Sequence, residues 1–333
     1  MMSKTALASQ MLHRSGLGTL LRKAGGHRGF IALNYHRIGR PDLSELDHGV
    51  FSATPESFQK QLDFLRNNCD VIGPEDIAEL PRRGRGNFAM ITFDDGYRDN
   101  YETAFPLLKA AGLPAVFFIT TGFMDAMRLS WWDEIAWMVR HCQKSAIGPT
   151  AMLPTAITLD RSNLEDAIGQ VLAIYKKLKS GATAAFMASL TQETGSGRAP
   201  TALSDKTWMT WDMIREMRDG GMAIGGHTVH HPILSSMARC EQDLEISGCA
   251  GAIEQHLGQP MKLFSYPRGK SDAFNEDTRA CLRDARVQYA FTYYGGMNRT
   301  ESLDNYDVRR VSVESDTQIE HFEAIVTLPK LFA

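Results

Sequence analysis

Two short motifs carry residues that could bind a metal ion and hydrolyse an amide. Asp94 and Asp95 are adjacent, and His227 and His231 lie close together further along the chain. Adjacent carboxylates repel each other when both are ionised, so a bound cation would relieve the cost of burying them. Two histidines and one carboxylate form a three-ligand set that leaves a coordination position for water. Such an ion acidifies its water and polarises a carbonyl oxygen, while the second carboxylate can accept the proton.

Each motif also has an interpretation without a metal ion. The Asp-Asp-Gly run at residues 94–96 is typical of a turn in which the aspartates bond to the backbone. A pair of histidines just before Pro232, taken alone, is more often solvated or packed in the core than bound to a metal. The joint occurrence of the two motifs favours a metal site, provided that the fold brings them together.

The elements that must position these motifs are short apolar runs that alternate with amphipathic helical patterns. Seven runs rich in β-branched and aromatic residues predict strands at residues 30–35, 89–93, 115–119, 222–226, 263–266, 289–292 and 308–313. Helical patterns between them indicate an α/β fold with a mainly parallel sheet. Seven such strands can close into a barrel or stay open and doubly wound, and we favour a closed or nearly closed barrel.

In a β/α barrel the catalytic groups collect where the strands end. Polar residues follow four of the predicted strands, and these are His36, Asp94 with Asp95, His227 with His231, and the run Tyr266-Pro267-Arg268. The pattern therefore predicts one face of the barrel that holds two carboxylates and several imidazoles.

The interval between the third and fourth predicted strands, about residues 123–206, is too long for a simple crossover. Its helical patterns predict a helical insertion at this point of the barrel. We expect an N-terminal helical segment at residues 1–29, the barrel with its insertion at residues 30–313, and a C-terminal helix at residues 314–333.

Three motifs resemble those of the polysaccharide deacetylase family, the NodB-homology group that includes carbohydrate esterase family 4. They are Thr92-Phe93-Asp94-Asp95-Gly96, His227-Thr228-Val229-His230-His231-Pro232 and Phe264-Ser265-Tyr266-Pro267-Arg268-Gly269. The likeness extends over about residues 30–313, because Asn34-Tyr35-His36-Arg37-Ile38 and Met209-Thr210-Trp211 resemble signatures of the bacterial polysaccharide-associated branch. It implies a distorted seven-stranded (β/α) barrel, a divalent metal ion, and removal of N-acetyl groups from chitin-like, peptidoglycan or exopolysaccharide sugars.

The resemblance also implies roles for individual residues. Asp94 resembles the general base, and Thr228 is expected to orient the histidine loop. A backbone N–H near residues 266–268 is expected to face the oxyanion. The implied metal ligands are Asp95, His227 and His231. Zinc is the expected ion, with cobalt, nickel or manganese as alternatives.

The sequence departs from the family pattern in two places. Ser265 and Arg268 stand in the third motif where many members carry an arginine and an aromatic residue, which leaves the substrate contacts there open. The late Leu-x-His motif, whose histidine is the family's general acid, is absent. The only histidine after Val313 is His321, which lies in a helix-like segment without that context.

Three groups could compensate for these departures. His36 is the candidate general acid from its position at the end of the first predicted strand, with a structural role as the alternative. Arg309 and Arg310, at the seventh predicted strand, could orient Asp94 or supply the charge of the missing arginine, and a surface ion pair is their alternative. An exposed indole could stack on a sugar ring, although core packing is the default for most of Trp131, Trp132, Trp208 and Trp211.

Composition and charge limit the kinds of molecule that the protein could bind and indicate where in the cell it is located. The chain has 36 Lys and Arg against 39 Asp and Glu, a net charge of -3, which provides no broad field for nucleic acid. Its 5 cysteines are odd in number and lack a C-x-x-C pair, so they are typical of reduced structural thiols. The first 28 residues have no uninterrupted apolar run of the secretory kind, which predicts a cytoplasmic location.

No apolar run is long enough to predict a transmembrane segment. The segment at residues 7–23 is basic and amphipathic, however, and could rest on a membrane surface as a peripheral contact. A helix that simply docks on the rest of the protein is the favoured alternative.

Taken together, the sequence predicts a metal-dependent hydrolase that removes N-acetyl groups from the amino sugars of an oligo- or polysaccharide. Chitooligosaccharides and an exopolysaccharide precursor are the leading substrates. Two alternatives stay open: a metal-dependent amidase of the same fold that acts on a small non-sugar amide, and a non-catalytic carbohydrate-binding homologue. The intact base and ligand set argue against the second.

Overall fold

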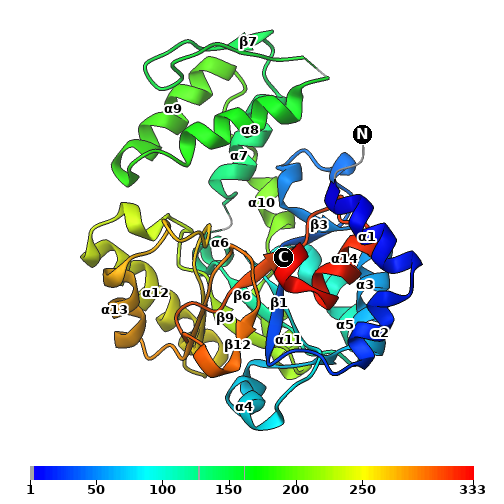
Figure 1. Ribbon diagram of the computed structural model, residues 1–333. Helices are drawn as coiled ribbons and strands as arrows, with labels where there is room; N and C mark the ends of the chain where they lie inside the picture. The colour runs from blue at the N-terminus through cyan, green and yellow to red at the C-terminus, as the bar shows by residue number, and fades with distance from the viewer. Residues whose placement is uncertain (1–3, 127, 161) are drawn as a thin grey trace.

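A curled sheet lies at the centre of the computed structural model, which describes residues 4–126, 128–160 and 162–333 (Figure 1). Its strands are β1 (Gly29–Tyr35), β4 (Asp70–Val71), β5 (Phe88–Phe93), β6 (Val116–Ile119), β9 (Ala223–Gly226), β10 (Leu263–Ser265), β11 (Tyr289–Phe291), β12 (Asn298–Arg299) and β13 (Arg310–Ser312). Hydrogen bonding gives the order β11-β10-β9-β6-β5-β1, with β4 beside β5 and with β12 and β13 on β1. All these pairs are parallel except β1 with β12.

The curl of the sheet brings its two ends together along a narrow seam. β13 pairs with β1 at one end of the order, and β11 lies at the other. Val308, just before β13, forms an isolated parallel bridge with Phe291 at the end of β11. Only a short stretch of backbone hydrogen bonds crosses here, including Thr292 N–H to the Val308 oxygen at 2.8 Å. The sheet is therefore a curled half-barrel whose two ends meet at a seam with few backbone hydrogen bonds.

All seven strands predicted from the sequence are present in this sheet, as β1, β5, β6, β9, β10, β11 and β13. The predicted α/β fold with a mainly parallel sheet is therefore confirmed, and the sheet curls into a half-barrel where a closed or nearly closed barrel was favoured. Two sheet strands, β4 and β12, were not predicted. The small pairs β2 (Arg37–Ile38) with β3 (Phe51–Ala53) and β7 (Ala146–Ile147) with β8 (Ile157–Thr158) were not predicted either. None of these missed strands lies within an apolar, β-rich run of the kind that marked the seven predicted strands.

Alternation along the strands separates the barrel interior from the layer beneath the helices. In β5, Phe88 and Met90 belong to the interior cluster, whereas Ala89, Ile91 and Phe93 pack outward against the helices. Successive side chains of a strand point to opposite faces, so the next interior position after residues 88, 90 and 92 is residue 94. A carboxylate therefore stands where the apolar interior stripe reaches the end of the strand.

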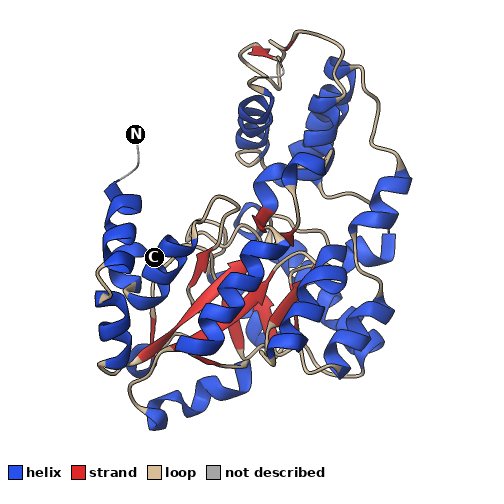
Figure 2. Ribbon diagram, turned by 90° about the vertical axis from the view of Figure 1, so that its right-hand side faces the viewer, coloured by secondary structure: helices blue, strands red, loops and turns tan. Residues whose placement is uncertain are grey.

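Helices cover the outside of the sheet (Figure 2). They are α1 (Lys4–Arg14), α2 (Leu17–Lys23), α3 (Pro55–Asn68), α4 (Leu80–Arg83), α5 (Phe105–Ala111), α6 (Thr121–Ala126), α7 (Trp131–Arg140), α8 (Leu164–Tyr175), α9 (Thr183–Thr194), α10 (Thr201–Thr207), α11 (Trp211–Asp219), α12 (Arg239–Leu257), α13 (Glu276–Asp284), α14 (Ile319–Thr327) and α15 (Pro329–Phe332). Among the described residues, no helix is both long and apolar enough to cross a bilayer.

The chain between β6 and β9 supplies α6 to α11 and the β7–β8 pair. α7, α8 and α9 stand together above one end of the sheet (Figure 1). They pack on one another through an apolar cluster that includes Ile135, Ile168 and Phe186. That this segment is an insertion into a shared family core stays a prediction, as do the three domain boundaries.

Candidate functional site

Asp94 is held inside the barrel by an arginine from the neighbouring end of the sheet. The guanidinium of Arg310 donates from Nη1 to Oδ1 at 2.7 Å and from Nη2 to Oδ2 at 2.8 Å. Asn34 Nδ2 and Ser265 Oγ also donate to Oδ2, at 3.3 Å and 3.2 Å. The side chain of Arg310 is 0% exposed, and its register with Ala32 of β1 directs it inward. The result is a fully buried, two-point ion pair.

This environment keeps Asp94 ionised. Burial acts to raise its pKa, but the nearby charges of Arg310 and His227 and the hydrogen bonds from Arg310 outweigh burial. The net effect is a pKa well below the ordinary value for an aspartate. Asp94 is therefore a carboxylate of fixed direction at the C-terminal end of β5.

Asp95 turns away from its neighbour toward the two histidines. Its φ of 74° places it in the left-handed region, which non-glycine residues rarely adopt. Its Oδ1 lies 3.5 Å from Nε2 of His227 and 3.5 Å from Nε2 of His231. The three ligand atoms all lie within 4.8 Å of one another, and all three side chains are buried. The structure therefore brings together the predicted ligand set.

The histidine loop is shaped by Thr228. Its hydroxyl donates to the His227 carbonyl at 2.5 Å and accepts from the His231 N–H at 2.9 Å. Thr228 and His231 both have positive φ, 68° and 57°, which is strained backbone for a β-branched residue in particular. The hydroxyl thus fixes the turn that directs both imidazoles toward Asp95, as predicted for this residue.

One tautomer of His227 follows from its neighbours. Nδ1 lies 2.7 Å from the Ser265 carbonyl oxygen, which can only accept, so Nδ1 carries the hydrogen. Nε2 then presents its lone pair toward Asp95. Metal-binding histidines commonly donate their second nitrogen to a carbonyl in this way.

The donor set fits a divalent cation. Oδ1 of Asp95 is buried and has no hydrogen-bond partner among the described residues. Burial, and then the charge of Asp94, raises the pKa of Asp95 well above its ordinary value. Burial lowers the pKa of His227 to about 4, so this imidazole stays neutral at physiological pH. An unpaired buried carboxylate oxygen beside two neutral imidazole nitrogens is stabilised by a cation rather than by a proton donor.

The site opens into a cavity of about 1060 Å³. Asp94, Asp95 and both histidines line its floor. One wall comes from α8, through Ile168 and Leu172. The remaining lining includes both polar groups and aromatic rings, among them His36, Lys176, Arg268, Trp131, Trp132 and Tyr293. A cavity of this size and mixed character suits an organic substrate larger than the acetamide group alone.

His36 faces this cavity, as predicted from its position. Its ring lies edge-on to Tyr293, with ring centroids 5.8 Å apart. Its backbone N–H donates to Ser52 Oγ at 3.0 Å, and its carbonyl accepts from Asn100 Nδ2 at 2.7 Å. Burial lowers its pKa, and the charge of Asp94 partly opposes this effect. The imidazole is thus close to the reacting region while its backbone is firmly anchored.

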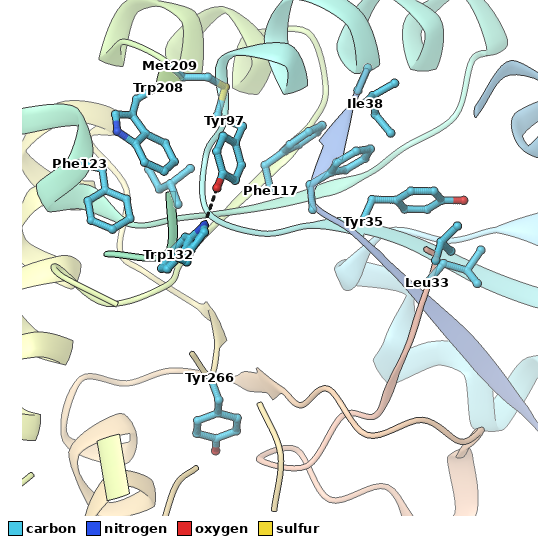
Figure 3. Close-up of a cluster of buried hydrophobic side chains, with 14 of the residues drawn as sticks. Leu33, Tyr35, Ile38, Tyr97, Phe117, Phe123, Trp132, Trp208, Met209 and Tyr266 are labelled. Atoms are coloured by element: carbon cyan, nitrogen blue, oxygen red, sulfur yellow. Dashed lines mark hydrogen bonds between the residues drawn. The ribbon is translucent and has the colours of Figure 1, made fainter. Parts of the chain in front are cut away.

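The third motif differs from the prediction in one respect. The backbone N–H of Tyr266 donates to the Phe291 oxygen at 3.0 Å, and its hydroxyl donates to the Tyr306 oxygen at 3.0 Å. Its ring stacks on Phe274 at 4.0 Å and lies well apart from the other labelled side chains in Figure 3. The N–H of Tyr266 is therefore taken up by the sheet and is not the predicted oxyanion donor of residues 266–268, although Tyr266 lines the cavity.

The next two residues, Pro267 and Arg268, are the remaining candidates for a backbone N–H that faces the oxyanion. Pro267 has no N–H to donate. Arg268 has a φ of 61°, and no described backbone oxygen accepts its N–H. Its guanidinium pairs with Asp272 at 3.1 Å. Of the three predicted residues, only Arg268 has a backbone N–H free to face the cavity.

Arg309 and Arg310 have different environments in the structure. Arg310 is buried against Asp94, whereas the side chain of Arg309 is 50% exposed and lies 3.8 Å from Asp307. The alternation of β13 separates them, since neighbouring residues of a strand point to opposite faces. The alternative of a surface ion pair therefore holds for Arg309.

Trp132, for which core packing was the default expectation, also packs against the candidate metal ligand His231. Trp132 lies edge-on to His231, with ring centroids 4.5 Å apart. Its Nε1 donates to the hydroxyl of Tyr97 at 2.7 Å, the bond drawn in Figure 3. That hydroxyl donates to Asp133 Oδ2 at 2.8 Å, and Ser130 Oγ donates to the same oxygen at 2.9 Å. The start of α7 is thereby joined to the site by a buried hydrogen-bond network.

Asn34 and Ser265 were not predicted as parts of the site, and Trp132 was considered only as one of four indoles that could stack on a sugar. Asn34 could have been found, because it stands at an interior position one residue before the end of the first strand. No local signal marks Trp132, whose position depends on how α7 packs over the barrel.

Comparison with known proteins gives a family match over most of the chain. A sequence model of the polysaccharide deacetylase family matches residues 82–144 and 149–290. The poly-beta-1,6-N-acetyl-D-glucosamine N-deacetylase of Escherichia coli (strain K12) is 30% identical over 105 residues, which are 30% of this chain and 15% of that protein. The alignment thus spans only a small part of this relative's own length.

Two solved structures share the fold. Streptococcus pyogenes deacetylase PplD in complex with acetate superimposes with a TM-score of 0.56 at 17% identity, covering 88% of this chain and 95% of that chain. IcaB from Ammonifex degensii superimposes with a TM-score of 0.55 at 19% identity, covering 90% of this chain and 98% of that one. At these identities the likeness concerns the fold alone.

Proposed function

Because this chain belongs to the polysaccharide deacetylase family, we propose that it removes N-acetyl groups from the amino sugars of an oligo- or polysaccharide, with the help of a divalent metal ion. The observation that carries the proposal is the buried Asp95-His227-His231 set next to an ionised Asp94, at the floor of a large cavity. This combination supplies ligands and a base for amide hydrolysis.

The substrate class follows from the relatives and the cavity together. The Escherichia coli relative is named for poly-β-1,6-linked N-acetylglucosamine. We therefore place an exopolysaccharide or its precursor built of N-acetylglucosamine first, and chitooligosaccharides second. The cavity of about 1060 Å³ has room for more than one sugar unit and for aromatic contact with them.

The metal would be held by Asp95, His227 and His231, and zinc is the expected ion. When bound there, the ion would lower the pKa of a coordinated water and polarise the acetyl carbonyl oxygen. His227 is kept in the correct tautomer by the Ser265 carbonyl, and Thr228 holds the turn between the two histidines.

Asp94 is the proposed general base. Its two oxygens are directed by Arg310, so that the carboxylate stays ionised and cannot rotate away from the ligand set. Its Oδ2 lies 3.9 Å from Nε2 of His227, which places it beside the reacting region. Proton transfer to a positioned carboxylate contributes a factor of about 10² to 10⁴ to such reactions.

His36 is the proposed general acid for the leaving amine, and the N–H of Arg268 is the proposed donor to the oxyanion. Both line the cavity that also contains Asp94. A donor of this kind acts by stabilising charge that develops only in the transition state.

The test is acetate release from N-acetylglucosamine oligomers, both β-1,6-linked and chitin-derived. Purified protein is stripped of metal by chelation and then restored with zinc, cobalt, nickel or manganese. We expect metal-dependent release that Asp94→Asn lowers by about 10²-fold or more, and that His227→Ala abolishes by loss of metal binding. Asp205→Asn, at an exposed carboxylate on α10, is the matched control and should leave the rate unchanged.

Other outcomes point to the remaining candidates. Tight metal binding with release of acetate only from a small non-sugar amide would indicate an amidase of the same fold. Glycan binding without release from any substrate would indicate a carbohydrate-binding homologue. The cytoplasmic location stays a prediction, and fractionation of the native protein would test it.

A further inference from the structure

The two N-terminal helices carry an exposed apolar surface that the proposed reaction does not use. Of nine large apolar side chains exposed among the described residues, five lie on α1 and α2. They are Leu7, Met11, Leu17, Leu20 and Leu21, with exposed fractions of 53%, 64%, 49%, 64% and 37%. We call these five residues the N-terminal apolar patch.

The patch lies on one face of each helix. Leu7 and Met11 are four residues apart on α1, and Leu17, Leu20 and Leu21 follow the same helical spacing on α2. Residues three and four apart share a face of a helix. Each helix therefore directs a continuous apolar stripe away from the protein.

The opposite faces of α1 and α2 are fastened to the C-terminal helix α14. Ser9 is buried and its hydroxyl lies 3.0 Å from His321 Nδ1, while Arg22 donates to Thr327 Oγ1 at 2.7 Å. α1 and α14 lie side by side (Figure 1). Since the inward faces are occupied, the exposed stripes are not a misplaced part of the core.

The charge carried by α1 and α2 themselves is entirely positive, although Glu320 and Glu323 of the neighbouring α14 lie beside their inward faces. Residues 1–28 contain no Asp or Glu and carry five cationic residues, although the whole chain has a net charge of -3. Arg14 and Lys23 are exposed, and no described carboxylate pairs with either of them. Apolar residues flanked by unpaired cations are the composition of helices that lie at the surface of an anionic bilayer.

We propose that the N-terminal apolar patch docks on the surface of an anionic membrane, with its side chains in the headgroup region and Arg14 and Lys23 on lipid phosphates. The charge decides between this partner and a second copy of the chain, because two copies would bring like charges together. The inference is independent of the proposed reaction, since it involves no residue of the catalytic cavity.

Docking on this side has a consequence for access to the site. A groove of about 990 Å³ lies between α1 and the end of β13, and Thr5 and Ser9 form part of its lining. Lys270 and Tyr293 line both this groove and the catalytic cavity. The catalytic cavity therefore lies next to the region that would contact the membrane.

The test is flotation of the full chain with vesicles of phosphatidylcholine alone or mixed equally with phosphatidylglycerol. We expect binding to the anionic vesicles that 0.5 M salt weakens. Arg14→Gln with Lys23→Gln should weaken binding by about fivefold per cation removed. Met11→Ser with Leu20→Ser should weaken it at least as much, because the interface then gains less apolar contact.

A matched control removes exposed apolar side chains elsewhere. Leu43→Ser with Leu244→Ser changes residues that are 77% and 70% exposed and lie outside the patch, and should bind vesicles like the unchanged chain. Melting curves and acetate release from a soluble oligomer should be the same for all three double variants, which separates docking from folding and from the proposed reaction.

Three results would overturn the proposal. The unchanged chain could fail to bind vesicles of either composition, or Met11→Ser with Leu20→Ser could bind as well as the unchanged chain. Light scattering could also show a dimer that this variant converts to a monomer, in which case a second copy occupies the patch.

Discussion

At the scale of single residues, the ion pair of Asp94 with Arg310 leads to a prediction about the catalytic rate. Lysine would keep the charge at position 310 but lose the two parallel hydrogen bonds that fix the carboxylate. We expect Arg310→Lys to lower kcat by about 10-fold to 100-fold with little change in KM, because the base loses its direction while substrate contacts remain. Steady-state kinetics of acetate release measures both constants.

Arg309→Lys is the matched control, since Arg309 is adjacent in sequence but 50% exposed. It should change neither constant. An equal loss for both variants would mean that residue 310 acts through the stability of β13 and not through Asp94.

The buried thiols give a second prediction at this scale. Burial raises the pKa of Cys249 to about 12, so almost no thiolate is present at pH 8, whereas Cys240 on the same helix is exposed. Thiolates are the reactive form, so iodoacetamide should modify Cys240 in the native protein and Cys249 only after unfolding. Peptide mass spectrometry reads out both sites. Rapid native modification of Cys249 would contradict its placement in the core.

The residues that could be predicted from the sequence are those whose spacing along the chain encodes the chemistry. The positions of Asp94, Asp95, His227 and His231 are of this kind, because they lie in the loops that follow the ends of β5 and β9. The sequence could not show which N–H of residues 266–268 is free. Whether an N–H is free depends on the strand that pairs beside it, and a single segment carries no information about that partner.

At the scale of elements, α7 is joined to the barrel by the Tyr97 hydroxyl, which bridges Trp132 and Asp133. Tyr97→Phe leaves a buried indole N–H without an acceptor and removes a hydrogen bond to Asp133. We expect a loss of about 1–3 kcal/mol in the free energy of unfolding, measured by urea denaturation. Tyr101→Phe is the control, because its hydroxyl bonds to Glu216 near the surface and its loss should be below about 0.5 kcal/mol.

The prediction of elements succeeded where runs were long enough to show a period. All seven core strands were found in this way, each from an apolar run of at least four residues. The missed pairs β2–β3 and β7–β8 are held by contacts between distant segments, for example Arg37 with Phe51. Such pairing is decided by tertiary packing and not by local propensity.

At the scale of the whole molecule, the seam between β11 and β13 should open before the boundary between β1 and β5. It rests on the Phe291–Val308 bridge, whereas β1 and β5 pair over six residues. Amide hydrogen exchange should therefore be faster at Thr292 and Val308 than at Leu33 and Ile91, in the absence of global unfolding. Equal protection at both boundaries would show that the barrel opens only as a unit.

The seam also makes the chemistry sensitive to local unfolding. β13 carries Arg310, only two residues beyond the bridging Val308, so an excursion that opens the seam and also separates β13 from β1 removes the partner of Asp94. Mild urea should then inactivate the enzyme reversibly at concentrations at which circular dichroism still reports a native fold. The rate of turnover would thus report the closure of the seam. It would detect local opening that a spectroscopic measurement of average secondary structure misses.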